Sequence, residues 1–290
     1  MKENVHSTIK GLLNQKLIKI EKYFKADVFS YYGQIVDGIE NDILNIIEEL
    51  ANSRPKRDRL IVILTTGGGS AIAVERYVNI IRHHYKEVEF VVPNYAYSAG
   101  TIFCMSGDKI HMDYFSVLGP IDPQVQNKDG KWVAALGYLD KVNEVIEKSR
   151  HGTLTEAEFL LFKDLDLAEL RSYEQAKDLT IQLLKKWLVK YKFKNWNTHR
   201  TSPALVGQPV TEEQKVKRAE EIANMLNNNT EWNSHGRPIN IQKLREMRLE
   251  IDDYSDVTAL KSIIREYHDL LSDYVISNKT PIFVHTRNYI

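Results

Sequence analysis

The sequence predicts an α/β protein built on a mainly parallel sheet. Two apolar runs, residues 60–64 and 88–93, are separated by an amphipathic helical stretch at residues 71–84. The first run ends in Thr66-Gly67-Gly68-Gly69, and the second ends in Ala96-Tyr97-Ser98-Ala99-Gly100. A strand, a crossover helix and a parallel neighbouring strand bring both turns to the same edge of one sheet.

The remaining segments extend this pattern in both directions along the chain. A β-prone segment at residues 28–35 precedes an amphipathic helix at residues 39–51, and residues 109–112 form a short predicted strand. A hairpin tip is expected at residues 127–131, before a region in which helices dominate. Capping boxes mark two helix starts, at Thr155 and Thr211. Helices are predicted over residues 7–24, 139–148, 155–191, 211–226, 241–247 and 257–274.

The predicted domain organisation is one large body with an appendage at each end. Residues 1–25 form a helical arm, residues 26–255 the body, and residues 256–290 a helical C-terminal extension. The arm has apolar residues at three- and four-residue steps, and we expect it to pack on the body or on a neighbouring subunit. Its lysines leave a membrane-surface helix as the alternative.

Composition restricts the class of protein. The 290 residues include 39 basic and 39 acidic side chains, so a strongly basic face for nucleic acid is not expected. The single cysteine, Cys104, excludes an internal disulfide and a cysteine-rich zinc site. The N-terminus lacks an apolar core of signal-peptide length, and no apolar run is long enough to span a bilayer. We therefore expect a cytoplasmic protein without a membrane span, a metal or a cofactor.

A glycine turn beside an exposed serine is the arrangement that acyl transfer needs. The turn offers backbone N–H groups to an oxyanion, and Ser98 can be the nucleophile. Ser98 can instead be a helix N-cap, which is the commonest use of such a serine. The glycines can equally form a plain strand–helix turn; a phosphate cradle is disfavoured because no Gly-Lys-Ser/Thr follows them.

Four segments in order resemble a known family. They are Thr66-Gly67-Gly68-Gly69, Ala96-Tyr97-Ser98-Ala99-Gly100, Leu118-Gly119-Pro120-Ile121-Asp122-Pro123-Gln124 and Trp232-Asn233-Ser234-His235-Gly236-Arg237-Pro238-Ile239. Together they resemble the Clp-protease/crotonase fold, with its stacked ββα units, and within it the serine dehydrogenase proteinase family, relatives of signal peptide peptidase A. The resemblance covers roughly residues 25–255. It implies a mainly parallel sheet and a helical C-terminal region.

The resemblance implies roles for individual residues. Ser98 would be the nucleophile, and the N–H groups of Gly68 or Gly69 and of Ala99 would form the oxyanion hole. Clp proteases carry a histidine base near the position that Asp122 occupies here, so a triad of their kind is unsupported.

Signal peptide peptidase relatives use a lysine further along the chain, in the region of Lys141 and Lys148. We prefer Lys141, which is nearer the start of its predicted helix. A lysine base needs burial and a lowered pKa. His235 is a third candidate base, and Asp122 and His235 are further expected to shape the site.

The predicted function is that of a soluble serine peptidase with a Ser98–lysine pair, acting on peptides or proteins as a homo-oligomer. The alternative is a catalytically inactive binding or scaffold protein of the same fold. Acyl-coenzyme A chemistry is a third possibility, because crotonases share the fold.

Overall fold

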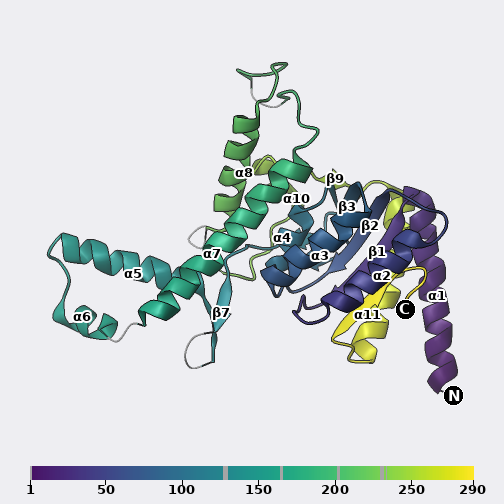
Figure 1. The fold of residues 1–290 in the computed structure, drawn as a ribbon, viewed down its shortest axis with the longest axis horizontal. Helices are drawn as coiled ribbons and strands as arrows, with labels where there is room; N and C mark the ends of the chain where they lie inside the picture. Colours follow the sequence, from purple (N-terminus) through teal and green to yellow (C-terminus); the bar gives the residue numbers. More distant parts are fainter. Residues whose placement is uncertain (1, 127–129, 164–165, 201–202, 229–231, 233) are drawn as a thin grey trace.

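The computed structural model describes residues 2–126, 130–163, 166–200, 203–228, 232 and 234–290. Its centre is a six-stranded sheet in the order β10-β1-β2-β3-β5-β9 (Figure 1). All neighbouring strands run parallel except β10, which is antiparallel to β1. The strands are β1 (Asp27–Gly33), β2 (Arg59–Thr65), β3 (Glu87–Val92), β5 (Lys109–Met112), β9 (Asp252–Asp253) and β10 (Ile282–His285). The predicted α/β fold with a mainly parallel sheet is confirmed.

Both faces of this sheet are covered by helices. Along β2, Leu60, Val62 and Leu64 belong to one buried cluster, whereas Ile61 and Ile63 belong to a second one. This explains why the strand reads as a continuous apolar run, since successive side chains face opposite sides. The first cluster includes α2 (Glu40–Asn52), α3 (Ala71–His84) and α4 (Ala99–Met105). The second includes α1 (Lys2–Phe24) and α11 (Thr258–Ser277).

The two ends of the chain lie together on one side of the sheet. Leu13, Leu17 and Ile20 of α1 are fully buried, so α1 packs on the body as the predicted N-terminal arm. The C-terminal extension is not helical throughout: α11 is followed by β10, which pairs with β1. A four-residue run of this kind is too short for periodicity to separate strand from helix, and its pairing with β1 decides its structure.

The C-terminal half of the body is helical, as predicted. Its helices are α5 (Ala135–Arg150), α6 (Glu156–Phe162), α7 (Leu167–Trp187), the π-helical turn η1 (Leu188–Lys192), α8 (Glu212–Leu226) and α10 (Ile241–Glu246). Both capping boxes are present, at Thr155 and Thr211. Helices α5 and α6 project away from the sheet, and α7 returns towards it (Figure 1). We call α5, α6 and the first half of α7 the helical arm of the body.

Two small sheets complete the fold. β4 (Tyr95–Ala96) pairs with β6 (Val117–Leu118), and β7 (Gln124–Gln126) pairs with β8 (Trp132–Ala134). Residues 127–129 of the predicted hairpin tip lie outside the described residues.

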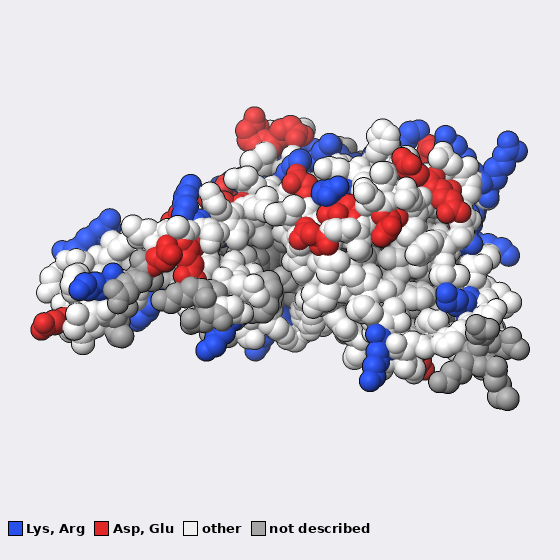
Figure 2. All heavy atoms as spheres, turned by 60° about the horizontal axis from the view of Figure 1, so that its bottom comes forward, with Lys and Arg blue, Asp and Glu red and all other residues white. Residues whose placement is uncertain are grey.

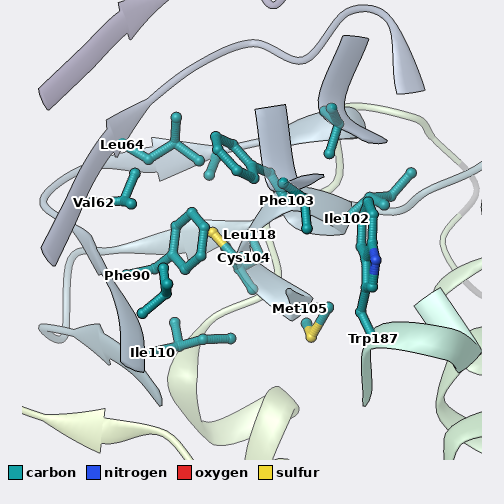
Figure 3. Packing of buried hydrophobic residues seen from close by; sticks show 14 of the residues in the cluster. Val62, Leu64, Phe90, Ile102, Phe103, Cys104, Met105, Ile110, Leu118 and Trp187 are labelled. Atoms are coloured by element: carbon teal, nitrogen blue, oxygen red, sulfur yellow. The ribbon is translucent and has the colours of Figure 1, made fainter. Parts of the chain in front are cut away.

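Helix α4 is short but firmly held. All seven of its residues are buried, and the Phe103 ring lies edge-on to Phe90, with 4.9 Å between ring centroids. Figure 3 shows Phe103, Cys104 and Met105 of α4 among strand residues of the sheet, with Trp187 of α7 nearby. Burial on all sides compensates for the few hydrogen bonds of a two-turn helix. The residue that precedes α4 is Ser98, so its position is fixed by the core.

Among the described residues, no helix has both the length and the apolar character needed to cross a membrane. The face drawn in Figure 2 carries basic and acidic side chains together, in keeping with the equal numbers of the two in the sequence.

Candidate active site

The glycine turn and the Ser98 turn meet at the carboxyl edge of the sheet. Thr66, which follows β2, donates its N–H to the Tyr95 carbonyl at 3.1 Å and accepts from the Tyr97 N–H at 3.0 Å. A Cβ placed on Gly68 would lie 2.8 Å from the Ser98 Cβ and 3.4 Å from its Oγ. The prediction that both turns end side by side is therefore confirmed.

Ser98 has an unusual backbone conformation. Its φ of 52° and ψ of −117° lie in the left-handed half of conformational space, which non-glycine residues rarely adopt. Ser98 occupies the N-cap position of α4, yet within the described residues its side chain makes no capping hydrogen bond. The side chain is half-buried and so not sealed in the core. A strained serine between a strand and a helix is the geometry of a nucleophile elbow.

The backbone amides around Ser98 differ in their hydrogen bonds. The Gly68 N–H donates to the Thr66 Oγ1 at 3.0 Å. The Gly68 carbonyl accepts from the Ile35 N–H at 2.8 Å, and the Ser70 N–H donates to the Ile35 carbonyl at 2.9 Å. In such a parallel bridge the N–H of the middle residue, Gly69, points away from Ile35. That direction is the side of β2 on which β3 and the Ser98 turn lie.

The amides of Gly69 and Ala99 are two that are left for a ligand. In the part of the chain that the structure describes, neither N–H has a hydrogen-bond acceptor. Ala99 is the first residue of α4, where backbone N–H groups are not used inside the helix and carry a partial positive charge. Gly68, by contrast, already donates to Thr66, so it supports the loop rather than offering a free donor.

The two predicted lysines lie on α5, in the helical arm of the body. Lys141 Nζ is 2.8 Å from Glu144, and its side chain is 55% exposed. Lys148 Nζ bonds Glu158 at 2.6 Å and Glu144 at 2.9 Å. The hydrogen bonds to Glu158 and Glu144 raise the pKa of Lys148 above its ordinary value, which favours the protonated amine. Neither lysine is buried in the way that a neutral base requires.

Among the described residues, a lysine with a lowered pKa lies elsewhere. Burial lowers the pKa of Lys192, in the π-helical turn η1, to about 8. Asp108 and Lys109, two of the charged groups that act on it, stand at the amino end of β5. Ser98 follows the carboxyl end of β3, at the opposite edge of the sheet. Lys192 is therefore placed away from the serine.

His235 and Asp122, which were predicted separately, form a pair. His235 Nδ1 lies 2.9 Å from Asp122 Oδ1; the Asp122 side chain is 2% exposed and that of His235 27% exposed. A carboxylate at Nδ1 holds the neutral ring with its proton on Nδ1, which leaves Nε2 as an acceptor. The ring is thus oriented and half-exposed, as a general base needs to be.

The loop that carries Asp122 is attached to the Ser98 turn. β6 pairs with β4 directly before Ser98, and Leu118 exchanges backbone hydrogen bonds with Ile239. The buried Thr101 of α4 binds this loop through its hydroxyl, which lies 2.8 Å from the Gly119 carbonyl and accepts from the Gly119 N–H at 3.0 Å. The segments around Ser98, Asp122 and His235 therefore belong to one hydrogen-bonded unit.

The nearest histidine after Ser98 in the sequence has another role. His111 lies in β5, as predicted, with Nε2 2.7 Å from Glu89 Oε2. Its ring contacts Phe24 of α1, at the face of the sheet covered by that helix. His111 is therefore part of a buried ion cluster beneath α1.

Sequence reasoning did not single out Thr66 and Thr101, whose hydroxyls join these turns. Both are buried, at 1% and 0% exposure. The signal in the sequence is a polar, β-branched residue beside glycine, at a position where an apolar residue is expected. This signal is weak because threonine is common at strand ends.

Comparison with known proteins places this site in a family. The model of the ClpP-like SDH-type serine proteinases matches residues 35–207, which is more than half of the chain. Two uncharacterized proteins of Methanocaldococcus jannaschii are similar: MJ1495 is 25% identical over 214 residues, 73% of this chain and 56% of that protein. MJ0137 is 39% identical over 71 residues, 24% of this chain and 25% of that protein. This chain thus spans about half the length of MJ1495, and less of MJ0137.

Two solved structures are also similar. A mutant of the 1510-N membrane-bound stomatin-specific protease has 14% identity and a TM-score of 0.45, with 80% of each chain covered. A second mutant, in complex with a substrate peptide, has 18% identity and a TM-score of 0.36 over 55% of this chain and 57% of that one. The assignment rests on the family match and on its position, which includes both turns at the carboxyl edge. This chain belongs to the ClpP-like SDH-type serine proteinase family.

Proposed function

We propose that this chain cleaves peptide bonds through an acyl-enzyme on Ser98. The observation that carries the proposal is the strained, half-buried Ser98 in contact with the glycine turn. The Ser98 Oγ would form a bond to the substrate carbonyl carbon while its proton passes to a base. The C–N bond would then break as the base returns that proton to the leaving amine. Water would hydrolyse the resulting ester.

The Gly69 and Ala99 amides are the proposed oxyanion donors. Their free N–H groups, one directed to the Ser98 side of β2 and one at the start of α4, support this role. Each such donor typically lowers the barrier by about 3–4 kcal/mol. Gly68 is proposed to act indirectly: because it has no side chain, the glycine turn can lie in contact with Ser98.

Two groups compete for the role of base. The family resemblance favours a lysine of α5, and Lys141 is the better of the two because the ion pairs of Lys148 raise the pKa of its amine. The specific contact between His235 and Asp122 favours His235 as the second candidate. Substitution of each candidate in turn separates them.

The test is labelling with a fluorophosphonate probe, which reacts with activated serines. We expect Ser98→Ala to abolish labelling. Among Lys141→Met, Lys148→Met and His235→Gln, the variant that lacks the base is expected to lose about a hundredfold or more in labelling rate. Equal labelling of wild type and Ser98→Ala would refute the peptidase and leave a binding or scaffold role.

We also propose that copies of this chain assemble through the helical arm of the body. Leu160 of α6 and Leu167 of α7 are 59% and 75% exposed, and Phe159 is 56% exposed. The same arm carries a groove of about 360 Å³ between α5 and α7, lined by Leu139, Val142, Ile146 and Leu170 and by the charges of Arg171, Glu174, Lys177 and Asp178. An apolar projection and a mixed groove that holds apolar side chains and both signs of charge suit a self-complementary contact between copies.

Sedimentation velocity tests the assembly. Leu160→Glu is expected to release monomers, because it places a charge in the contact. Ile276→Glu is the matched control, since Ile276 of α11 is 67% exposed outside the arm. A monomeric wild type, or equal sedimentation of both variants and wild type, would contradict the proposal.

A further inference from the structure

We infer that Thr66 is a positioning residue that sets the spacing between the proposed oxyanion donors and the Ser98 nucleophile. The inference rests on the proposed function of Ser98 and adds a residue to which neither the sequence motifs nor the family match assigns a role. It depends on two contacts made by opposite sides of one side chain.

The hydroxyl of Thr66 holds the glycine turn. Its Oγ1 accepts from the Gly68 N–H at 3.0 Å and lies 3.3 Å from the Gly68 carbonyl oxygen. Gly68 has a φ of +110°, so the chain bends sharply there and needs a fixed hydrogen bond to keep one geometry. Because Gly68 is thereby occupied, the next amide, that of Gly69, is the one presented to a ligand.

The methyl group of Thr66 meets the helix that begins after Ser98. A Cβ on Gly100, the second residue of α4, would collide with the Thr66 Cγ2. Glycine at that position therefore lets the backbone of α4 pack directly against the Thr66 methyl group. The backbone of Thr66 completes the connection, since its N–H and carbonyl both bond the chain on either side of Ala96.

One rigid, β-branched side chain thus touches both halves of the site. Thr66 is buried at 1% exposure and has a stiff χ1, so a shift of the glycine turn relative to α4 requires Thr66 to move. Oxyanion donors act only when they stand at hydrogen-bond distance from the developing charge. Loss of the hydroxyl contact is therefore expected to reduce the chemical step and to leave initial binding unchanged, whereas loss of the methyl contact alone is expected to have a smaller effect.

Three variants separate the contacts. Thr66→Val keeps the shape and removes the hydroxyl, and Thr66→Ser keeps the hydroxyl and removes the methyl group. Thr65→Val is the matched control, because Thr65 is also buried, at 2% exposure, but precedes Thr66 in β2 and so faces the other side of the strand.

The measurement is the rate of fluorophosphonate labelling as a function of probe concentration. We expect Thr66→Val to lower the maximal labelling rate about tenfold or more at unchanged half-saturating probe concentration. Thr66→Ser and Thr65→Val are expected to stay within about threefold of wild type. A merely structural role of Thr66 would instead lower thermal stability in both Thr66 variants and would not be rescued by serine.

The outcomes distinguish this inference from the proposed function. Absence of Ser98-dependent labelling in the wild type would overturn both. Normal labelling of the wild type together with an unchanged maximal rate in Thr66→Val would overturn the role of Thr66 alone. If Thr66→Val does not fold, Thr66→Ala compared with Thr66→Ser gives the same test of the hydroxyl.

Discussion

Gly68→Ala is the substitution whose effect is most directly determined by the geometry of the site. The new Cβ would lie 2.8 Å from the Ser98 Cβ and 3.0 Å from the Tyr97 carbonyl oxygen. Real Cβ atoms essentially never come within 3.0 Å of another heavy atom, and ordinary contact begins at 3.4 Å. The glycine turn or Ser98 must therefore move by about half an ångström, and a misplacement of about 1 Å costs about a hundredfold in rate.

A second effect of Gly68→Ala acts on stability. The φ of +110° at this position is one that alanine rarely adopts. Such backbone strain costs about 1–3 kcal/mol in the free energy of unfolding. We therefore expect fluorophosphonate labelling to slow by about tenfold to a hundredfold, with a stability loss in that range measured by urea unfolding.

The neighbouring residue supplies a matched control. A Cβ on Gly67 would have the Gln34 side-chain nitrogen as its nearest neighbour, at 3.8 Å, and Gly67 is not among the glycines with positive φ. Gly67→Ala is thus expected to label and unfold like wild type. If Gly68→Ala and Gly67→Ala label at the same rate, the close contact between the glycine turn and Ser98 is not what the structure indicates.

Three further predictions concern buried groups. Burial lowers the pKa of His285 to about 3. The imidazole therefore stays neutral in the folded protein, while in the unfolded chain it binds a proton below about pH 6.5. The free energy of unfolding should accordingly fall by about 2 kcal/mol between pH 7 and pH 5 because of this group. In urea unfolding at these two pH values, the free energy of unfolding of His285→Asn should change by that much less than the wild type's. Burial by itself would raise the pKa of Glu89, but its hydrogen bonds with His111 and Arg59 lower it to about 2; the stability that Glu89 contributes should therefore disappear as pH falls from about 4.5 to 2, and a Glu89→Gln variant lacking that acid transition would support this. Burial raises the pKa of the Cys104 thiol; a thiol reagent at pH 8 should leave the folded protein unmodified and react in denaturant, and fast reaction of the folded protein would contradict the packing of α4.

The positions of both turns followed from local pattern. Strand, helix and strand each have a periodicity that is visible in a dozen residues, and a right-handed crossover leaves one arrangement for the ends of parallel strands. The helix at residues 71–84 has the predicted bounds, and the capping boxes at Thr155 and Thr211 begin helices where expected. These signals depend on residues that are close together in the sequence, so they can be recognised without knowledge of the fold.

The sequence by itself determined the central parallel strands, the order of the turns that follow them and the candidate nucleophile, because each depends on residues that are neighbours along the chain. Only the tertiary structure decided which of the predicted site residues pair with one another. The pair of His235 and Asp122 joins residues 113 positions apart, and its hydrogen bond depends on how two loops fold back to β6. The surroundings of Lys141 and Lys148 were likewise decided by the path of α5 away from the sheet, since the same helical pattern fits a buried or an exposed face. Distances between segments far apart in sequence are set by packing, which no local periodicity records.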